Sequence, residues 1–176
     1  VSRIAVVTGA TGAIGRAIAR QIAGNHVYEL ILLCRDEAKV REAVQEIVQV
    51  TGNRKVPYEL VDLSRRSSIE ALAGLWREPL YVLVNNAAVT PRRCEETPEG
   101  IELQFATNVM GYFWLIQAFI DRLKESASAR VVNVASYWAG NMENNWCLTA
   151  ACGWPNAIIQ FPHTLSGFSK NFSDLS

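Results

Sequence analysis

The chain has 176 residues, enough for one domain with a sizeable hydrophobic core. Lys and Arg together number 17, as do Asp and Glu, so no net charge draws the protein to nucleic acid or to an anionic membrane. The longest apolar run inside a helical segment, GYFWLIQAFI, is shorter than the ~20 residues that span a bilayer, which predicts a soluble protein without a transmembrane segment.

The number and spacing of the cysteines indicate whether the protein binds a metal and in which cellular compartment it resides. The four cysteines, at positions 34, 94, 147 and 152, lack the close pairs and flanking histidines of a zinc site, so we expect no metal. So few cysteines in a chain of this size fit a reducing compartment, and the sequence favours the cytoplasm. The first residue is Val1 and not methionine, which leaves an upstream targeting segment open.

From Ile4 to Ser136, short β-branched runs alternate with helical periods, the rhythm of βαβ units. RIAVVT contains the continuous apolar run IAVV, as a strand buried on both faces should, and the helix GRAIARQIA follows it and ends at Gly24. The second strand is YELILLC, and the helix after it has Asp36 as its N-cap and Gly52 as its stop.

The pattern continues with the strand VPYELVDL, the helix SSIEALAGLW and the strand LYVLVNN. Thr97 is a natural N-cap with Pro98 at the first helical position, so residues 97–124 are predicted to form one long helix before a fifth strand, RVVNVAS. These elements predict an α/β fold, a doubly wound parallel sheet of the Rossmann type in three α/β/α layers, with its C-terminal strands incomplete. Ligands should bind beyond the carboxyl ends of the strands.

The rhythm stops near residue 140. Residues 1–140 therefore form the predicted Rossmann-type domain. Residues 141–176 contain few charges and no clear period, so we regard them as an atypical tail that is either part of the same domain or poorly ordered.

Glycines stand directly after the first strand and at the start of the first helix, in VVTGATGAIGRAIA. Gly9 permits a sharp turn, Gly12 lets the backbone come close to a ligand, and Gly15 allows tight packing. Free N–H groups and the helix dipole at this point favour a pyrophosphate. The pattern predicts dinucleotide binding, and the alternative is a plain glycine-rich turn.

The end of the second strand distinguishes the two nicotinamide dinucleotides. An acidic side chain there would accept a hydrogen bond from the ribose 2′-hydroxyl and repel a 2′-phosphate. Here Cys34 takes that place and Arg35 follows, whose planar guanidinium suits a phosphate. The sequence therefore favours NADP over NAD and makes residues 1–140 an NADP-binding domain. The alternative is a solvated arginine at the end of a strand.

The glycine loop, NNAA after the fourth strand and NVAS at the end of the fifth together resemble the short-chain dehydrogenase/reductase family over about residues 3–140. LLCRDEAK, TPEGIELQFATNVMGYF and ARVVNVAS are most similar to its retinol-dehydrogenase-like members. The resemblance implies an oxidoreductase that transfers a hydride between NADP(H) and an alcohol or carbonyl substrate of lipophilic character. The spacing of the three glycines is instead similar to the extended members, which include epimerases, so that class is a further alternative.

The resemblance assigns roles to single residues. The segment from Thr8 to Gly15 would wrap the diphosphate and the adenosine ribose, Asp62 and Leu63 would contact the adenine, and Asn86 and Ala87 would lie under the nicotinamide ribose. For Asp62 the alternative is a loop cap. The implied cofactor-binding residues are Thr8, Gly9, Ala10, Thr11, Gly12, Ala13, Ile14, Gly15, Arg35, Asp62, Leu63, Asn86, Ala87 and Ala88.

The implied catalytic residues are Ser136, Asn108 and Lys170. In the family the matching serine bonds the substrate carbonyl, and the matching asparagine lies in a distorted part of its helix and holds the catalytic lysine through water. The alternatives are a strand-end cap for Ser136 and a core asparagine bonded to nearby backbone for Asn108.

The family's Tyr-x-x-x-Lys pair, which should follow Ser136 on the next helix, is missing. Lys170 is its one trace, and Ser166, four residues before it, carries an alcohol too weakly acidic to replace a phenol. We therefore do not expect efficient turnover from this chain, which looks truncated or altered after about residue 140. The second hypothesis is a catalytically inactive nucleotide-binding or interaction protein. A homo-oligomer would have an incomplete interface, because the family uses its fourth and fifth helices there.

Overall fold

A computed structural model describes residues 3–126 and 128–135 of the chain. Its sheet has five strands in the order β3-β2-β1-β4-β5, and every neighbouring pair is parallel. The strand order reverses between β1 and β4, which defines the switch point of a doubly wound sheet. The predicted Rossmann-type α/β fold is therefore confirmed. The strands are β1 (Arg3–Thr8), β2 (Tyr28–Cys34), β3 (Tyr58–Leu60), β4 (Leu80–Asn85) and β5 (Arg130–Asn133).

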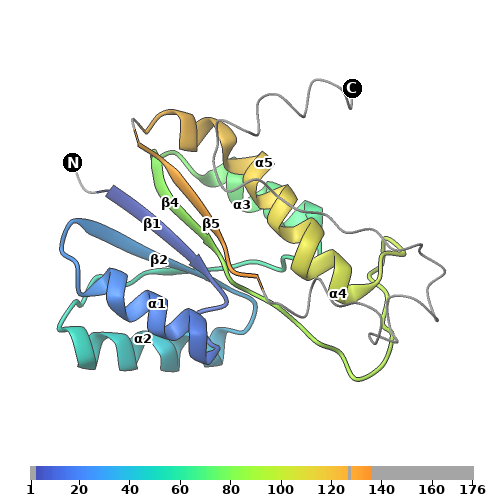
Figure 1. Cartoon of the computed structure of the whole chain (residues 1–176), viewed down its shortest axis with the longest axis horizontal. Coiled ribbons are helices and arrows are strands. Elements are labelled where there is room, and N and C mark those ends of the chain that lie inside the picture. The colour runs from blue at the N-terminus through green and yellow to red at the C-terminus, as the bar shows by residue number, and fades with distance from the viewer. Residues whose placement is uncertain (1–2, 127, 136–176) are drawn as a thin grey trace.

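Helices cover both faces of this sheet (Figure 1). On one face α1 (Ala13–Ala23) and α2 (Glu37–Thr51) close one apolar cluster, and on the other α3 (Arg66–Leu75) and α5 (Gly111–Lys124) close a second. In the second cluster the rings of Trp76 and Phe119 meet edge to face, with centroids 5.2 Å apart. Both layers are needed because the central strands are apolar on both sides.

The caps of α2 follow the sequence prediction. The Asp36 carboxylate accepts a hydrogen bond from the Lys39 N–H at 3.1 Å, and this bond is the main reason that the pKa of Asp36 lies below its ordinary value. At the other end Gly52 adopts a left-handed φ of 71° and closes the helix. The position of α2, and with it the end of β2, is thus fixed by local chemistry.

The helix predicted from Thr97 begins later, so that prediction was wrong at its start. Thr97 instead closes a turn, in which its hydroxyl accepts a hydrogen bond from the Ile101 N–H at 3.3 Å and Gly100 has φ 74°. The helical segment starts with the short α4 (Leu103–Phe105), and Glu102 is its N-cap. The two Glu102 carboxylate oxygens accept hydrogen bonds at 2.8 and 2.6 Å from the backbone N–H groups of residues 104 and 105.

The predicted helix is also interrupted in its middle. Between α4 and α5 lies a π-helical turn, η1 (Ala106–Met110), in which the wider spacing of backbone bonds shifts the side chains out of the regular helical register. Gly111 follows it, and a Cβ at that position would lie 2.6 Å from the Leu63 carbonyl oxygen. The close approach to the loop after β3 explains why the chain has no side chain there.

The third and fifth strands are shorter than predicted. VPYELVDL contributes only three residues to β3, which pairs with β2 at the edge of the sheet. The fifth strand was predicted to reach Ser136, and β5 ends at Asn133. Ser136 itself lies outside the described residues.

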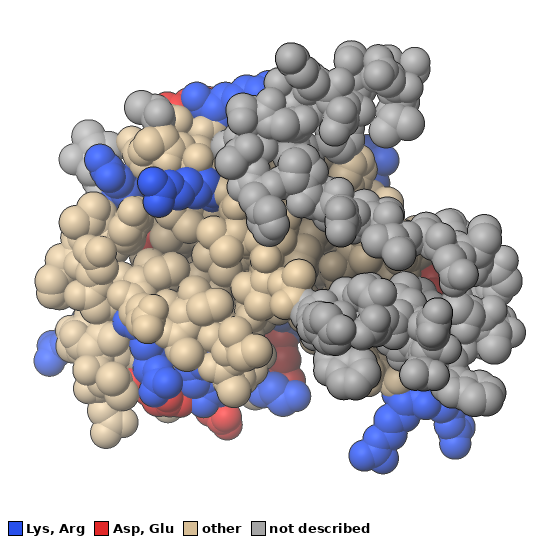
Figure 2. Space-filling model, in the orientation of Figure 1, with Lys and Arg blue, Asp and Glu red and all other residues tan. Residues whose placement is uncertain are grey.

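No helix in the described ranges is long and apolar enough to cross a bilayer. Among the described residues on the face shown in Figure 2, basic and acidic side chains form small separate groups near the edges, beside a broad uncharged area. The mixed signs agree with the balanced charge of the sequence.

We predict that Glu102→Ala lowers the free energy of unfolding by about 2 kcal/mol, because Glu102 is buried and its loss leaves two backbone donors at the start of α4 without acceptors. Urea denaturation measures the change. Glu99→Ala is the control, since this exposed residue of the same loop makes only a 3.8 Å ion pair with Arg65 and should change stability by less than about 0.5 kcal/mol. Equal effects of the two variants would show that Glu102 is not the cap.

Candidate functional site

A cavity of about 490 Å³ lies where β1, β2 and β4 end, at the switch point of the sheet. Its size suits a nucleotide or a comparable small molecule. All the predicted cofactor-binding residues line it except Thr8 and Ala10, which are buried and fully shielded from solvent. The structure thus brings together the glycine loop, the end of β2, and the segments after β3 and β4.

Thr8 joins the two loops at the switch point. Its hydroxyl accepts hydrogen bonds from the backbone N–H groups of Asn86 at 2.8 Å and Ala87 at 2.9 Å, and donates to the Val84 carbonyl at 3.3 Å. The Asn86 amide in turn donates to the carbonyls of Thr8 at 3.0 Å and Gly9 at 3.3 Å. Thr8 therefore joins the end of β1 to the segment after β4, and these two segments form opposite walls of the cavity.

Two glycines touch the opposite loop so closely that no side chain fits. Gly9 has φ 67°, and a Cβ there would lie 2.6 Å from the Ala87 Cα. At Gly15 a Cβ would lie 2.4 Å from both the Gly9 carbonyl oxygen and the Asn86 amide nitrogen. Gly12 differs, because a Cβ there would meet only the Gly9 carbonyl oxygen, at 3.6 Å. Gly9 and Gly15 are thus required by packing, whereas Gly12 faces open space.

The start of α1 presents free N–H groups. Gly12 is the N-cap and has no side chain, and the first turn carries no acidic residue. The first intrahelical bond runs from the Arg16 N–H to the Gly12 carbonyl at 2.9 Å, so the N–H groups of Ala13, Ile14 and Gly15 have no acceptor within the helix. A helix end of this kind attracts a negatively charged group.

Two cations stand at the end of β2. Arg35 and Lys39 are both exposed and both line the cavity, and the Lys39 ammonium lies 3.5 Å from the Asp36 carboxylate. The sequence analysis missed Lys39, although its place in the first turn after the predicted N-cap puts it on the side of the cavity. Asp36 lines the cavity as well, so Arg35 and Lys39 leave this corner with a single net positive charge.

Cys34 forms the wall between the glycine loop and these cations. Its residue is 5% exposed, and burial raises the pKa of its thiol, while the N–H groups of Ala10, Thr11 and Gly9 oppose that rise. The thiol is consequently protonated near neutral pH. It occupies the place where an acidic residue would repel a phosphate, and it carries no charge there.

Asp62 makes hydrogen bonds within the loop after β3, and it also lines the cavity. Its carboxylate accepts hydrogen bonds from the Ser64 N–H at 3.0 Å and the Ser64 hydroxyl at 2.7 Å, and its own N–H donates to the Ser68 hydroxyl at 3.0 Å. These contacts are those of a loop cap, the alternative stated for this residue. The side chain remains half-buried at the cavity wall.

Asn108 lies in the π-helical turn η1 and fixes the segment after β4. Its amide donates to the Val89 carbonyl at 3.0 Å and accepts from the Val89 N–H at 2.9 Å. The side chain thus makes the backbone contacts of the stated alternative, and it does not line the cavity. Ser136, Lys170 and Ser166 lie outside the described residues, so a role of Asn108 toward a lysine stays a prediction.

Tyr112 supports the same segment from α5. Its hydroxyl donates to the Ala87 carbonyl at 3.0 Å, and burial raises the pKa of this phenol to about 12. A phenol so buried keeps its proton at neutral pH. Tyr112 is therefore a structural residue of the cavity wall and a poor proton donor.

Thr107 is a second lining residue that the sequence analysis missed. It is 7% exposed, and within the described part of the chain its hydroxyl has no hydrogen-bond partner. A buried hydroxyl without a partner is unfavourable, so a ligand in the cavity is one group that would satisfy it. In the sequence, the only sign that Thr107 belongs to the site is its position next to Asn108 in FATNVM.

Metal binding finds no support in the part of the chain that is described, because no three His, Cys, Asp or Glu side chains gather there. The site is instead lined by backbone donors, the cations Arg35 and Lys39, two carboxylates that are bonded within their own segments, and neutral side chains. These groups suit an organic anion.

A family model for short chain dehydrogenases matches residues 3–152. Retinol dehydrogenase 11 of Homo sapiens is 40% identical over 139 residues, which are 76% of this chain and 43% of the relative. Polyprenol dehydrogenase of Homo sapiens is 34% identical over 166 residues, 88% of this chain and 49% of the relative. The chain therefore spans less than half the length of these curated relatives.

Solved structures agree with these similarities. A short chain dehydrogenase from Shigella flexneri 2a str. 301, complexed with NADP, is 29% identical, with a TM-score of 0.69 over 85% of this chain and 65% of its own. One from Escherichia coli CFT073, complexed with NADPH, is 29% identical, with a TM-score of 0.67 over 82% of this chain and 62% of its own. The resemblance seen in the motifs is confirmed, and the chain belongs to the short-chain dehydrogenase/reductase family.

Proposed function

We propose that the cavity at the switch point binds NADP(H) and that the chain is an oxidoreductase of alcohols or carbonyl compounds. The observation that carries the proposal is the meeting, around one cavity, of an uncapped helix start and the basic pair Arg35 and Lys39. Together they offer separate sites for a diphosphate and for a third phosphate. The NADP and NADPH in the two related structures support the same cofactor.

The residues present fit this cofactor. Gly9 and Gly15 keep the floor of the cavity free of side chains, and Thr107 lines the cavity with a hydroxyl that has no hydrogen-bond partner in the described part of the chain. When bound, the cofactor supplies or accepts the hydride. The N–H groups that start α1 would hold its diphosphate, and Arg35 and Lys39 its 2′-phosphate.

The substrate is proposed to be lipophilic. Among the relatives, a retinol dehydrogenase and a polyprenol dehydrogenase carry names that refer to lipophilic alcohols. Substrate orientation would fall to Ser136 by family resemblance. The extended, epimerase-like alternative gains no support, because these relatives are named as dehydrogenases.

A second candidate function is nucleotide binding without turnover. The specific observation in its favour is that no tyrosine of the sequence is followed four residues later by lysine. Tyr112, which bonds the lining residue Ala87 from behind, cannot replace the missing phenol because its proton is donated to the Ala87 carbonyl and burial raises its pKa to about 12. The two functions share one binding site and differ in whether a proton reaches the substrate.

Arg35→Gln is expected to raise the Kd for NADP+ by about thirtyfold and to leave the Kd for NAD+ within about twofold, since only the former carries the 2′-phosphate. Isothermal titration calorimetry on the full chain measures both. Arg41→Gln is the control, because Arg41 lies on α2 and is paired with Glu37 at 2.7 Å, outside the cavity. If both dinucleotides weaken equally, Arg35 does not select the phosphate.

Gly12→Ala and Gly15→Ala should separate binding from folding. A methyl group at Gly12 meets no backbone closer than 3.6 Å, so stability should change by less than about 1 kcal/mol while the NADP+ Kd rises at least about tenfold. The same change at Gly15 should cost about 3 kcal/mol of folding free energy, because its Cβ would stand 2.4 Å from backbone. Thermal unfolding and calorimetry provide the two readouts. Unchanged affinity in Gly12→Ala would contradict a ligand on this loop.

The catalytic question is settled by measuring NADPH binding through its fluorescence together with NADPH oxidation against a panel of aldehydes that includes retinal. We expect binding, with turnover about 10²- to 10⁴-fold slower than that of human retinol dehydrogenase 11 assayed in parallel, the usual loss when a general acid is missing. Turnover at the relative's rate would exclude the inactive alternative. Failure to bind would refute the cofactor site.

A further inference from the structure

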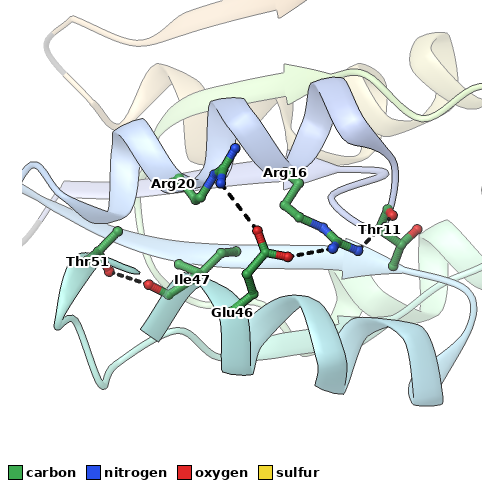
Figure 3. Close-up of polar contacts among 6 residues, drawn as sticks. All are labelled: Thr11, Arg16, Arg20, Glu46, Ile47 and Thr51. Atoms are coloured by element: carbon green, nitrogen blue, oxygen red, sulfur yellow. Dashed lines mark hydrogen bonds and ion pairs between the residues drawn. The ribbon is translucent and has the colours of Figure 1, made fainter. Parts of the chain in front are cut away.

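Arg16, in the second turn of α1, makes contacts in two directions. One guanidinium nitrogen, Nη2, donates to the Thr11 carbonyl in the glycine loop at 3.1 Å, and the other, Nη1, pairs with the Glu46 carboxylate of α2 at 2.6 Å. Figure 3 shows the guanidinium lying between these two partners. The fixed geometry of an arginine side chain suits it to hold two groups at once.

The contact with Thr11 anchors one peptide unit of the loop at both ends. The carbonyl of the Thr11–Gly12 peptide is held by Arg16, and its N–H donates to the Gly9 carbonyl at 3.1 Å. Arg16 does not line the cavity. The Thr11 carbonyl is therefore held toward Arg16, where its oxygen would not oppose a bound phosphate.

Arg20 provides an internal comparison. It lies one turn further along α1 and pairs with the same Glu46 carboxylate at 3.3 Å, but its place on the helix takes it away from the glycine loop (Figure 3). Arg16 is also the less exposed of the two side chains, at 28% against 40%, and its Nε is buried without a partner in the described part of the chain. A helix-to-helix ion pair alone does not require this burial.

We propose that Arg16 is a positioning residue of the cofactor site. It fixes the direction of the Thr11–Gly12 peptide, so that the N–H groups which follow stay directed at the diphosphate. Glu46 braces the guanidinium from α2, the helix that carries Lys39. The inference rests on the proposed binding of NADP(H), and it adds a residue outside the cavity that determines how well the loop binds.

The test compares Arg16→Gln with Arg20→Gln in the full chain. Each variant loses one ion pair with Glu46, and only the first loses the bond to the loop. Calorimetry gives the Kd for NADP+ and for adenosine 2′-monophosphate, which carries no diphosphate. NMR gives the exchange rate of the Gly12 N–H in the protein without ligand.

Arg16→Gln should raise the NADP+ Kd about tenfold, the equivalent of one hydrogen bond to a charged group, while adenosine 2′-monophosphate changes by less than about twofold. The Gly12 N–H should exchange faster in this variant by a similar factor. Arg20→Gln should leave both affinities and the exchange rate within about twofold of the parent chain.

Two results would overturn the inference. Equal changes in Arg16→Gln and Arg20→Gln would reduce Arg16 to a clamp between helices, and equal weakening of both ligands would show a general loss of structure. Failure of the unaltered chain to bind NADP+ is a different outcome, because it refutes the proposed function. The exchange rate of the Gly12 N–H would still report whether Arg16 orders the loop.

Discussion

The cavity depends on the contact between the first and fourth strand ends at the switch point. Gly9 and Gly15 approach Ala87 and Asn86 so closely that a single methyl group on either glycine would collide with backbone or an amide. Parallel strands alone would leave these loops apart, and the Thr8 hydroxyl draws them together with three hydrogen bonds. Loss of this contact would open the floor of the site and leave the N–H groups of α1 without a fixed direction.

The rest of the wall is held by residues that have no direct part in binding. Asn108 of η1 and Tyr112 of α5 fix the backbone of residues 87–89. Arg16 of α1 fixes the Thr11 carbonyl. The π-helical turn η1 matters here because its altered register places Asn108 against Val89 while the neighbouring Thr107 lines the cavity. The loops whose backbone N–H groups face the cavity are thus held in place by hydrogen bonds. The side chains of Arg35 and Lys39, in contrast, are exposed to solvent.

Much of the fold and of the cavity can be predicted from the sequence because it depends on local sequence rules. The strands around Val6 and Leu32 each contain a continuous apolar run. Asp36 and Gly52 are strong helix signals, and the glycine loop has a fixed relation to the strand before it. The helix start at Thr97 fails for a physical reason. Thr97 and Pro98 satisfy the rule for a helix start, but the turn at Gly100 intervenes, and the Glu102 carboxylate then caps with both of its oxygens.

Other features of the site cannot be predicted from any local sequence pattern. Periodicity does not reveal a π-helical turn, so Thr107 was counted as one more helical residue. The end of the strand gives no sign of Lys39, which comes to the same corner only because the folded helix α2 brings its first turn there. The bridge made by Arg16 depends on the packing of α1 against α2, which joins residues 30 positions apart in the chain.

Binding and chemistry are separable in this fold, and the two candidate functions differ only in the second. Among the described residues, those that line the cavity all lie before residue 109, on elements fixed by hydrogen bonds to one another. A proton donor must come from elsewhere, because moving the Tyr112 hydroxyl into that role would release the Ala87 carbonyl and loosen the wall that it supports. If the cavity binds a dinucleotide as proposed, the chain can do so without turning over a substrate. Turnover without cofactor binding is excluded, because a proton donor cannot complete the reaction when the cofactor that carries the hydride is not bound.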